Sequence, residues 1–119
     1  MITLSVGLAS AADARTRFLK AAVGAVAGRA AVAEPALYFA SYDDMHRVLA
    51  PSRLAIVKAM AGQGPLAIRE IARRVGRDVQ AVHRDVTTLA DAGVIDRSAD
   101  GLAFPYDRIR FAFDVSWAA

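Results

Sequence analysis

Cysteine is absent from the 119 residues, which excludes disulfide bonds, thiolate nucleophiles and cysteine-bound zinc. Histidine occurs only as His46 and His83, which lie far apart in the sequence, so a histidine metal site is not expected. The chain also has no Ser-His-Asp spacing and no metal-protease helix. We therefore expect no enzymatic activity, no cofactor and no bound metal ion.

Long apolar runs are missing as well, since no stretch approaches the ~20 residues that a membrane-spanning helix needs. Residues 1–12 are uncharged and end in small side chains, but they lack the basic start of a signal peptide. We expect a cytoplasmic protein that does not associate with membranes.

Glycines near each other occur at Gly62 and Gly64, but they lack the further glycines of a phosphate-binding loop. They and Pro65 indicate a turn. A short strand at residues 37–40, a helix cap at Ser41 and a helix beginning near Pro51 are expected before this turn.

Hydrophobic residues make up 55% of the chain, which is enough to fill the core of one domain. The formal net charge is only +3, but it is unevenly distributed. Residues 69–84 contain five arginines against Glu70 and Asp78, whereas the first 50 residues are nearly balanced. An arginine-rich helix is often only a solvated face, but here the charge coincides with a motif, which favours contact with nucleic acid.

That motif is a helix-turn-helix over residues 66–95, in which Gly76 marks the turn and a strand begins at Val94. Apolar residues recur at helical spacing on both sides of Gly76, so each helix has one face to bury. These residues are Ile71, Ala72, Val75, Val82, Val86 and Leu89. The pattern is typical of proteins that place the second helix in the major groove of DNA.

A hairpin is expected next, with strand-like residues 94–97, a turn at 98–101 and a return strand from Leu102. Pro105 would leave the hairpin open at its edge. Residues 109–115 alternate apolar and polar side chains, which predicts a further strand with one buried face. Together these elements predict the α+β class and a winged helix-turn-helix domain over residues 35–119.

Residues 1–34 are expected to form a separate extension, with a strand at 2–6 and a helix capped by Ser10. This extension is too small to fold alone, so it packs on its own chain or on a second copy. Its helix carries an apolar stripe that is our candidate dimer or partner interface. The stripe comprises Phe18, Leu19, Ala22, Val23 and Val26.

The helix from Asp78 to Ala92 is expected to enter the major groove with its N-terminal half leading. Candidate contacts to base edges are Gln80, Ala81, His83 and Arg84, and Arg84 is the favoured single residue because arginine pairs with guanine. Further DNA contacts are expected from phosphate clamps, from the wing and from the same helix. They are Arg69, Arg73, Arg74, Arg77, Arg97 and Thr88.

Each of these residues has a simpler alternative. The arginines can form surface ion pairs, Glu70 with Arg73 or Arg74, and Arg84 with Asp85 or Asp91. His83 suggests a metal ligand or a pH switch, but a surface histidine that forms hydrogen bonds is favoured.

Residues 51–106 resemble the winged helix-turn-helix of MarR-like transcriptional regulators. A narrower similarity is carried by residues 51–54, 64–78, 82–86, 93–95 and 104–110. In these segments the chain resembles small predicted prokaryotic DNA-binding proteins that commonly look like antitoxins encoded beside a small toxin. This resemblance implies autorepression together with neutralisation of a toxin protein.

A single winged helix reads few base pairs, so binding to double-stranded DNA is expected from a homodimer on two half-sites. Two alternatives to the antitoxin remain open from the residues alone. One is an ordinary MarR-like repressor without a toxin partner, and the other is a winged-helix module that binds only protein.

Overall fold

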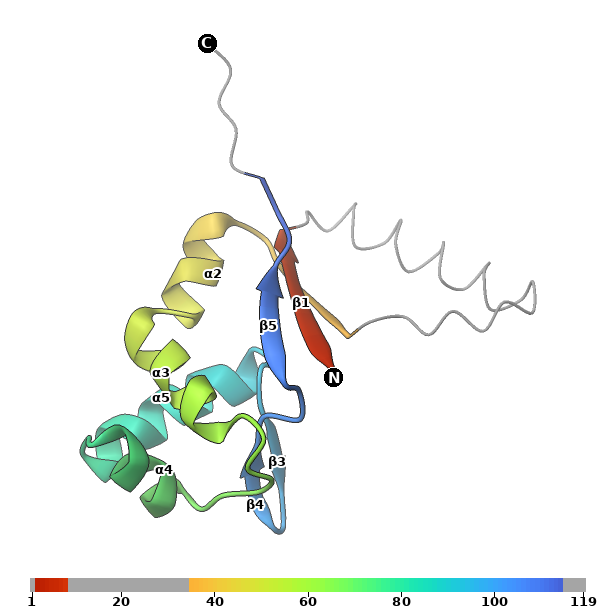
Figure 1. Ribbon diagram of the computed structural model, residues 1–119. Coiled ribbons are helices and arrows are strands. Elements are labelled where there is room, and N and C mark those ends of the chain that lie inside the picture. The colour runs from red at the N-terminus through yellow and green to blue at the C-terminus, as the bar shows by residue number, and fades with distance from the viewer. Residues whose placement is uncertain (1, 9–34, 115–119) are drawn as a thin grey trace.

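The computed structural model describes residues 2–8 and 35–114, which form a small α+β domain (Figure 1). The α+β class is therefore confirmed, and the order of helices and hairpin is compatible with a winged helix. No helix in the described ranges is long and apolar enough to cross a membrane. The strands and helices are β1 (Thr3–Leu8), β2 (Ala36–Phe39), α2 (Tyr42–Val48), α3 (Pro51–Met60), α4 (Ile68–Val75), α5 (Val79–Asp91), β3 (Asp96–Ser98), β4 (Gly101–Ala103) and β5 (Arg108–Phe111).

Three strands form a parallel sheet in the order β2-β1-β5. The strand predicted at residues 2–6 is confirmed as β1, which lies in the centre and places Leu4 beside Ile109 and Val6 beside Phe111. The expected division between residues 34 and 35 stays a prediction, but β1 pairs on both sides with strands from the second segment.

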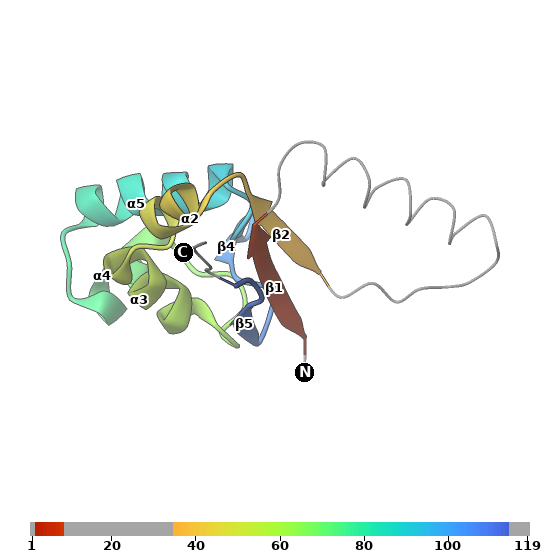
Figure 2. The same ribbon diagram turned by 90° about the horizontal axis from the view of Figure 1, so that it is seen from above.

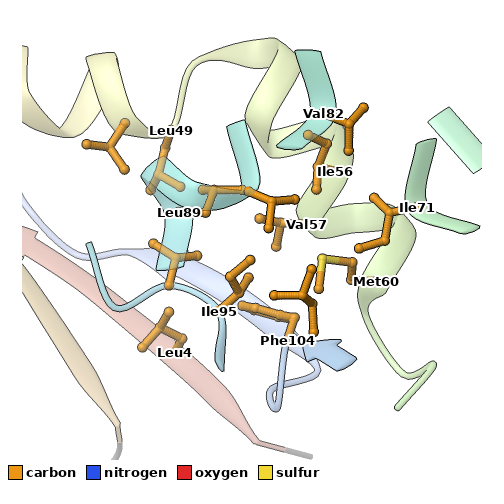
Figure 3. Packing of buried hydrophobic residues seen from close by; sticks show 14 of the residues in the cluster. Leu4, Leu49, Ile56, Val57, Met60, Ile71, Val82, Leu89, Ile95 and Phe104 are labelled. Atoms are coloured by element: carbon orange, nitrogen blue, oxygen red, sulfur yellow. The ribbon is translucent and has the colours of Figure 1, made fainter. Parts of the chain in front are cut away.

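The core lies between this sheet and the helices, which pack on one of its faces (Figures 1 and 2). Leu4 and Val6 point from β1 into the core and are 2% and 0% exposed. Ile56 from α3 and Leu89 from α5 belong to the same core (Figure 3). Burying each such side chain contributes about 1.5–3 kcal/mol, so β1 is stabilised mainly by its own chain.

Two signals ahead of the α4–α5 pair are confirmed. Ser41 caps α2, since its Oγ accepts a hydrogen bond from the Asp44 N–H at 3.1 Å. Pro51 occupies the first turn of α3. A backbone N–H group has no acceptor within the helix at this position, so proline costs no hydrogen bond.

The further strand predicted over residues 109–115 is present as β5, but its predicted buried face is wrong for the described residues. β5 ends at Phe111, Ile109 is half-buried, and Phe111 is 46% exposed. The physical reason is that β5 is an edge strand, and α3 leaves a groove beside it. The strand expected from Val94 begins at Asp96 instead, because Val94 and Ile95 are buried in the link from α5.

Some predictions fall outside the described residues. They concern the helix capped by Ser10, Val115 at the end of the last predicted strand, and the candidate interface residues Phe18, Leu19, Ala22, Val23 and Val26.

Candidate nucleic-acid interface

A sharp turn between α4 and α5 sets the position of the second helix. Gly76 ends α4 with φ +69°, a left-handed conformation that glycine adopts at little cost. Two residues later Asp78 caps α5, and its Oδ2 accepts hydrogen bonds from the Gln80 and Ala81 N–H groups at 3.0 and 3.2 Å. The beginning of α5 is therefore held firmly, with one face turned to solvent.

This free face of α5 carries Gln80, His83 and Arg84, all of which are exposed, as sequence spacing predicted. Ala81 and Thr88 lie at its margins and are half-buried. The face therefore presents one amide, one imidazole and one guanidinium group.

Arg69 in the first turn of α4 lies beside the free face of α5. An open hollow of about 480 Å³ separates the two helix beginnings and is lined by Arg69, Val79, Gln80, His83 and Arg84 among others. Within the part of the chain that the structure describes, the Arg69 and Arg84 guanidinium groups have no carboxylate partner and no hydrogen bond. Their positive charge is thus uncompensated.

A second groove, of about 350 Å³, runs between α5 and the β3–β4 hairpin. His83 and Thr87 line it from α5, and Arg97 lines it from β3. The Arg97 Nη2 group donates a hydrogen bond to Thr87 Oγ1 at 3.2 Å, which ties the hairpin to the helix. Our sequence prediction named Thr88 and missed Thr87. Thr87 lies three residues after Arg84 and four after His83, and this helical spacing places it on the free face.

The hairpin is fixed at its other edge by Leu66, which precedes α4. Leu66 and Leu102 exchange two backbone hydrogen bonds, of 2.8 and 2.9 Å. Gly101 beside them has φ +132°, and a Cβ atom there would lie 2.8 Å from the Leu66 carbonyl oxygen. The hairpin therefore stands at a defined position beside α5.

Arg73 and Arg74, both predicted phosphate clamps, are paired with Glu70 in the free protein. Arg73 Nε donates to Glu70 Oε2 at 3.0 Å, and Arg74 Nε donates to Oε1 at 2.9 Å. Arg74 also donates to Gln63 Oε1 at 2.7 Å. These are the ion pairs that helical spacing offered as the alternative to phosphate contact.

The Arg73 and Arg74 hydrogen bonds lower the pKa of Glu70 from 4.5 to about 2. Since the folded pKa lies below the unfolded one, the stabilising contribution is complete above pH 4.5 and is lost as the pH falls toward 2. We expect wild-type unfolding free energy to fall more over this range than that of Glu70→Gln, measured by urea denaturation at each pH. An NMR titration that placed the Glu70 pKa near 4.5 would contradict this expectation.

Arg77 is paired too, with the carboxylate of Asp85 on α5. Asp85 is only 9% exposed, and its Oδ2 accepts from Arg77 Nη1 at 2.7 Å. Its Oδ1 accepts from Arg53 Nε on α3 at 3.2 Å, and Arg53 also donates to the Arg47 carbonyl oxygen. Sequence spacing suggested Asp85 as a partner of Arg84, whereas Asp85 joins α3, the turn and α5.

The basic character of this surface therefore comes from fewer residues than the sequence indicated. Of ten candidate DNA contacts, Arg73, Arg74 and Arg77 are paired with neighbouring carboxylates, Glu70 or Asp85. The remaining candidates lie around the two grooves or at the margin of the free face: Arg69, Gln80, Ala81, His83, Arg84, Thr88 and Arg97. Among the described residues, no three side chains of the metal-ligating types form a cluster.

The chain belongs to the protein family described as HVO_A0114, whose family model matches residues 48–111. The match begins at the end of α2 and runs through β5, so it contains both grooves and the α4–α5 pair. No curated protein and no solved structure matches the chain. The resemblance to MarR-like regulators and to antitoxins stays a prediction.

Proposed function

We propose that this protein is a winged helix-turn-helix that binds double-stranded DNA through the free face of α5. The observation that carries the proposal is the pair of uncompensated arginines, Arg84 and Arg69, on either side of one open hollow. The order of elements supports it, since α3, the Leu66 bridge, α4, α5 and the β3–β4 hairpin follow one another as in a winged helix. In this proposal the hairpin is the wing.

The geometry divides the contacts into two kinds. Gln80, His83 and Arg84 project from the first two turns of α5 and are assigned to base edges, with Arg84 suited to bidentate contact with guanine. Arg69 lines the hollow beside Gln80 and Arg84, Arg97 lines the groove beside Thr87, and both arginines are assigned to phosphates. Arg73, Arg74 and Arg77 add less affinity, because phosphate must compete with Glu70 or Asp85 for them.

Arg84→Ala tests this proposal, with Arg73→Ala as a matched control from the neighbouring helix. The DNA is a duplex selected from a random pool by binding to the wild-type protein. We expect Arg84→Ala to lose about 1–3 kcal/mol of binding free energy, which is about 5- to 150-fold in Kd. Arg73→Ala is expected to change Kd by less than about threefold, as an exposed ion pair contributes little.

Fluorescence anisotropy at several salt concentrations gives the second readout. The logarithm of the wild-type binding constant is expected to fall linearly with the logarithm of the salt concentration. The slope is set by the number of phosphates that the protein neutralises. Arg69→Ala and Arg97→Ala are expected to make the slope less steep by about one unit each. Binding that responds neither to salt nor to Arg84→Ala would show that α5 does not read DNA.

We propose further that the protein acts in the cytoplasm as a homodimeric transcriptional repressor. Two copies are needed because one α5 reads only a few base pairs. The antitoxin role, with a small toxin as partner, rests on the sequence resemblance. Copurification with the product of the adjacent gene tests it, and light scattering on the DNA complex tests the dimer.

A further inference from the structure

Among the described residues, the backbone groups on the outer edge of β5 have no hydrogen-bond partner. Ala112 N–H donates to the Val6 carbonyl oxygen at 2.8 Å. The backbone N–H and C=O groups of alternate residues therefore point toward β1, and these residues are Arg108, Arg110 and Ala112. Ile109 and Phe111 then direct their N–H and C=O groups away from the sheet. In residues 2–8 and 35–114 no strand lies on that side, because the sheet order ends at β5 (Figures 1 and 2).

An apolar groove of about 310 Å³ accompanies this edge on the helix side of the sheet. Leu54, Val57 and Ala61 line it from α3, and Ile109 and Phe111 line it from β5. Phe111 is 46% exposed, although its ring packs edge-to-face on Phe113 at 6.3 Å between centroids. A large aromatic side chain exposed beside unpaired backbone is typical of a surface that another chain covers.

The opposite face of the same edge is basic. Arg108 and Arg110 are exposed there, and Arg108 Nε donates to Thr3 Oγ1 at 2.7 Å. Within the described residues Arg110 has neither a hydrogen bond nor a carboxylate partner. At the groove, Lys58 and Arg108 stand against one carboxylate, that of Asp107, which already accepts a hydrogen bond from the Ile2 N–H. One edge thus offers apolar surface on one side and uncompensated positive charge on the other.

We propose that β5 receives an extended segment of a partner protein as a fourth strand of the sheet. Side chains of a strand alternate between its two faces, so the segment alternates apolar residues with aspartate or glutamate. The apolar side chains would enter the groove beside Phe111, and the carboxylates would face Arg110.

A second copy of this chain fits the edge poorly in the register centred on Arg110. In antiparallel pairing that places Ile109 opposite Phe111 of the other copy, the two Arg110 side chains lie directly opposite each other. Like charges in that position destabilise a strand pair, and charged residues on an edge commonly prevent self-association. The charge of the edge therefore favours an acidic partner over self-pairing.

The test uses the full chain and a capped hexapeptide that alternates valine and glutamate. Two control peptides carry lysine in place of glutamate, or N-methyl groups on alternate backbone nitrogens, which prevent strand pairing. We expect the glutamate peptide to bind at least tenfold more tightly than either control, measured by fluorescence anisotropy. Peptide-induced NMR shifts are expected at the Ile109 and Phe111 amides.

Variants separate this proposal from DNA binding. Arg110→Glu is expected to weaken binding of the glutamate peptide at least tenfold and to strengthen binding of the lysine peptide. Its affinity for DNA is expected to stay unchanged. Arg84→Glu is the matched control. It is expected to abolish DNA binding and to leave peptide binding unchanged. Phe111→Ala removes an exposed side chain, so the variant is expected to fold. It is expected to bind the glutamate peptide more weakly than the wild-type protein does.

Three results would overturn the proposal: equal binding of the glutamate and lysine peptides, undiminished binding of the N-methylated peptide, or no binding of any peptide. A dimer in light scattering that Phe111→Ala dissociates would also overturn it, because the edge would then belong to a second copy.

Discussion

Replacing Asp85 with alanine is expected to lower the free energy of unfolding by about 2–4 kcal/mol. The Asp85 carboxylate lies between the guanidinium groups of Arg53 and Arg77, at 3.2 and 2.7 Å. Removing it leaves two positive charges beside each other, with side chains only 23% and 34% exposed. Their partial exposure to water keeps the effect below that of a fully buried pair.

Asp91→Ala is the matched control, since Asp91 is an exposed aspartate on the same helix. We expect it to change stability by less than about 0.5 kcal/mol. Urea denaturation followed by circular dichroism measures both variants. A loss under about 1 kcal/mol for Asp85→Ala would mean that Asp85 is an ordinary surface partner and does not set the position of α5.

The second large effect is expected from Gly101→Ala in the hairpin. The φ of +132° at Gly101 is unfavourable for alanine, and strain of this kind costs about 1–3 kcal/mol. The new Cβ atom would also lie 2.8 Å from the Leu66 carbonyl oxygen, which is backbone and moves only with its strand. We therefore expect a loss at the upper end of this range.

Gly62→Ala separates the two causes. Gly62 also has a positive φ, of +73°, but no atom lies within 4 Å of the place that an alanine methyl group would occupy. This variant is expected to cost at most about 1–2 kcal/mol, as is usual for a left-handed alanine. Equal losses from the two variants, measured by thermal unfolding, would show that the close approach of Leu66 does not matter.

The helices around the site are predictable because their signals are local. Gly76 and Asp78 specify where α4 ends and α5 begins, through backbone conformation and capping that involve only nearby residues. The spacing of Val82, Val86 and Leu89 likewise identifies the buried face of α5, and all three are at most 1% exposed. The free face that carries Arg84 follows from the same spacing.

The sheet is less predictable, because alternation of side chains reports burial and not the identity of the neighbouring strand. Ile109 and Phe111 alternate with polar residues as a half-buried strand does, yet their position at the edge leaves Phe111 exposed. Nothing local in residues 2–6 indicates that β1 lies between β2 and β5. Such pairing depends on contacts between distant segments.

The ion pairs of the site show the same limit. Glu70 lies three and four residues before Arg73 and Arg74, so helical spacing alone suggested these pairs. Asp85 lies eight residues after Arg77 and far from Arg53, and only the packing of α3 on α5 brings the three side chains together. Charge counting therefore could not show which arginines near the turn are free of a carboxylate partner.

The central position of β1 has a consequence for biosynthesis. The Thr3 side chain accepts its hydrogen bond from Arg108, which is 105 residues further along the chain. While the ribosome is making the residues in between, β1 has no β5 to pair with, although the α4–α5 pair can already form its local contacts. Closing the sheet over so long a loop is slow, and an unpaired strand edge is prone to aggregate. The edge of β1 that faces β5 therefore stays unpaired until Arg108 to Phe111 have been made.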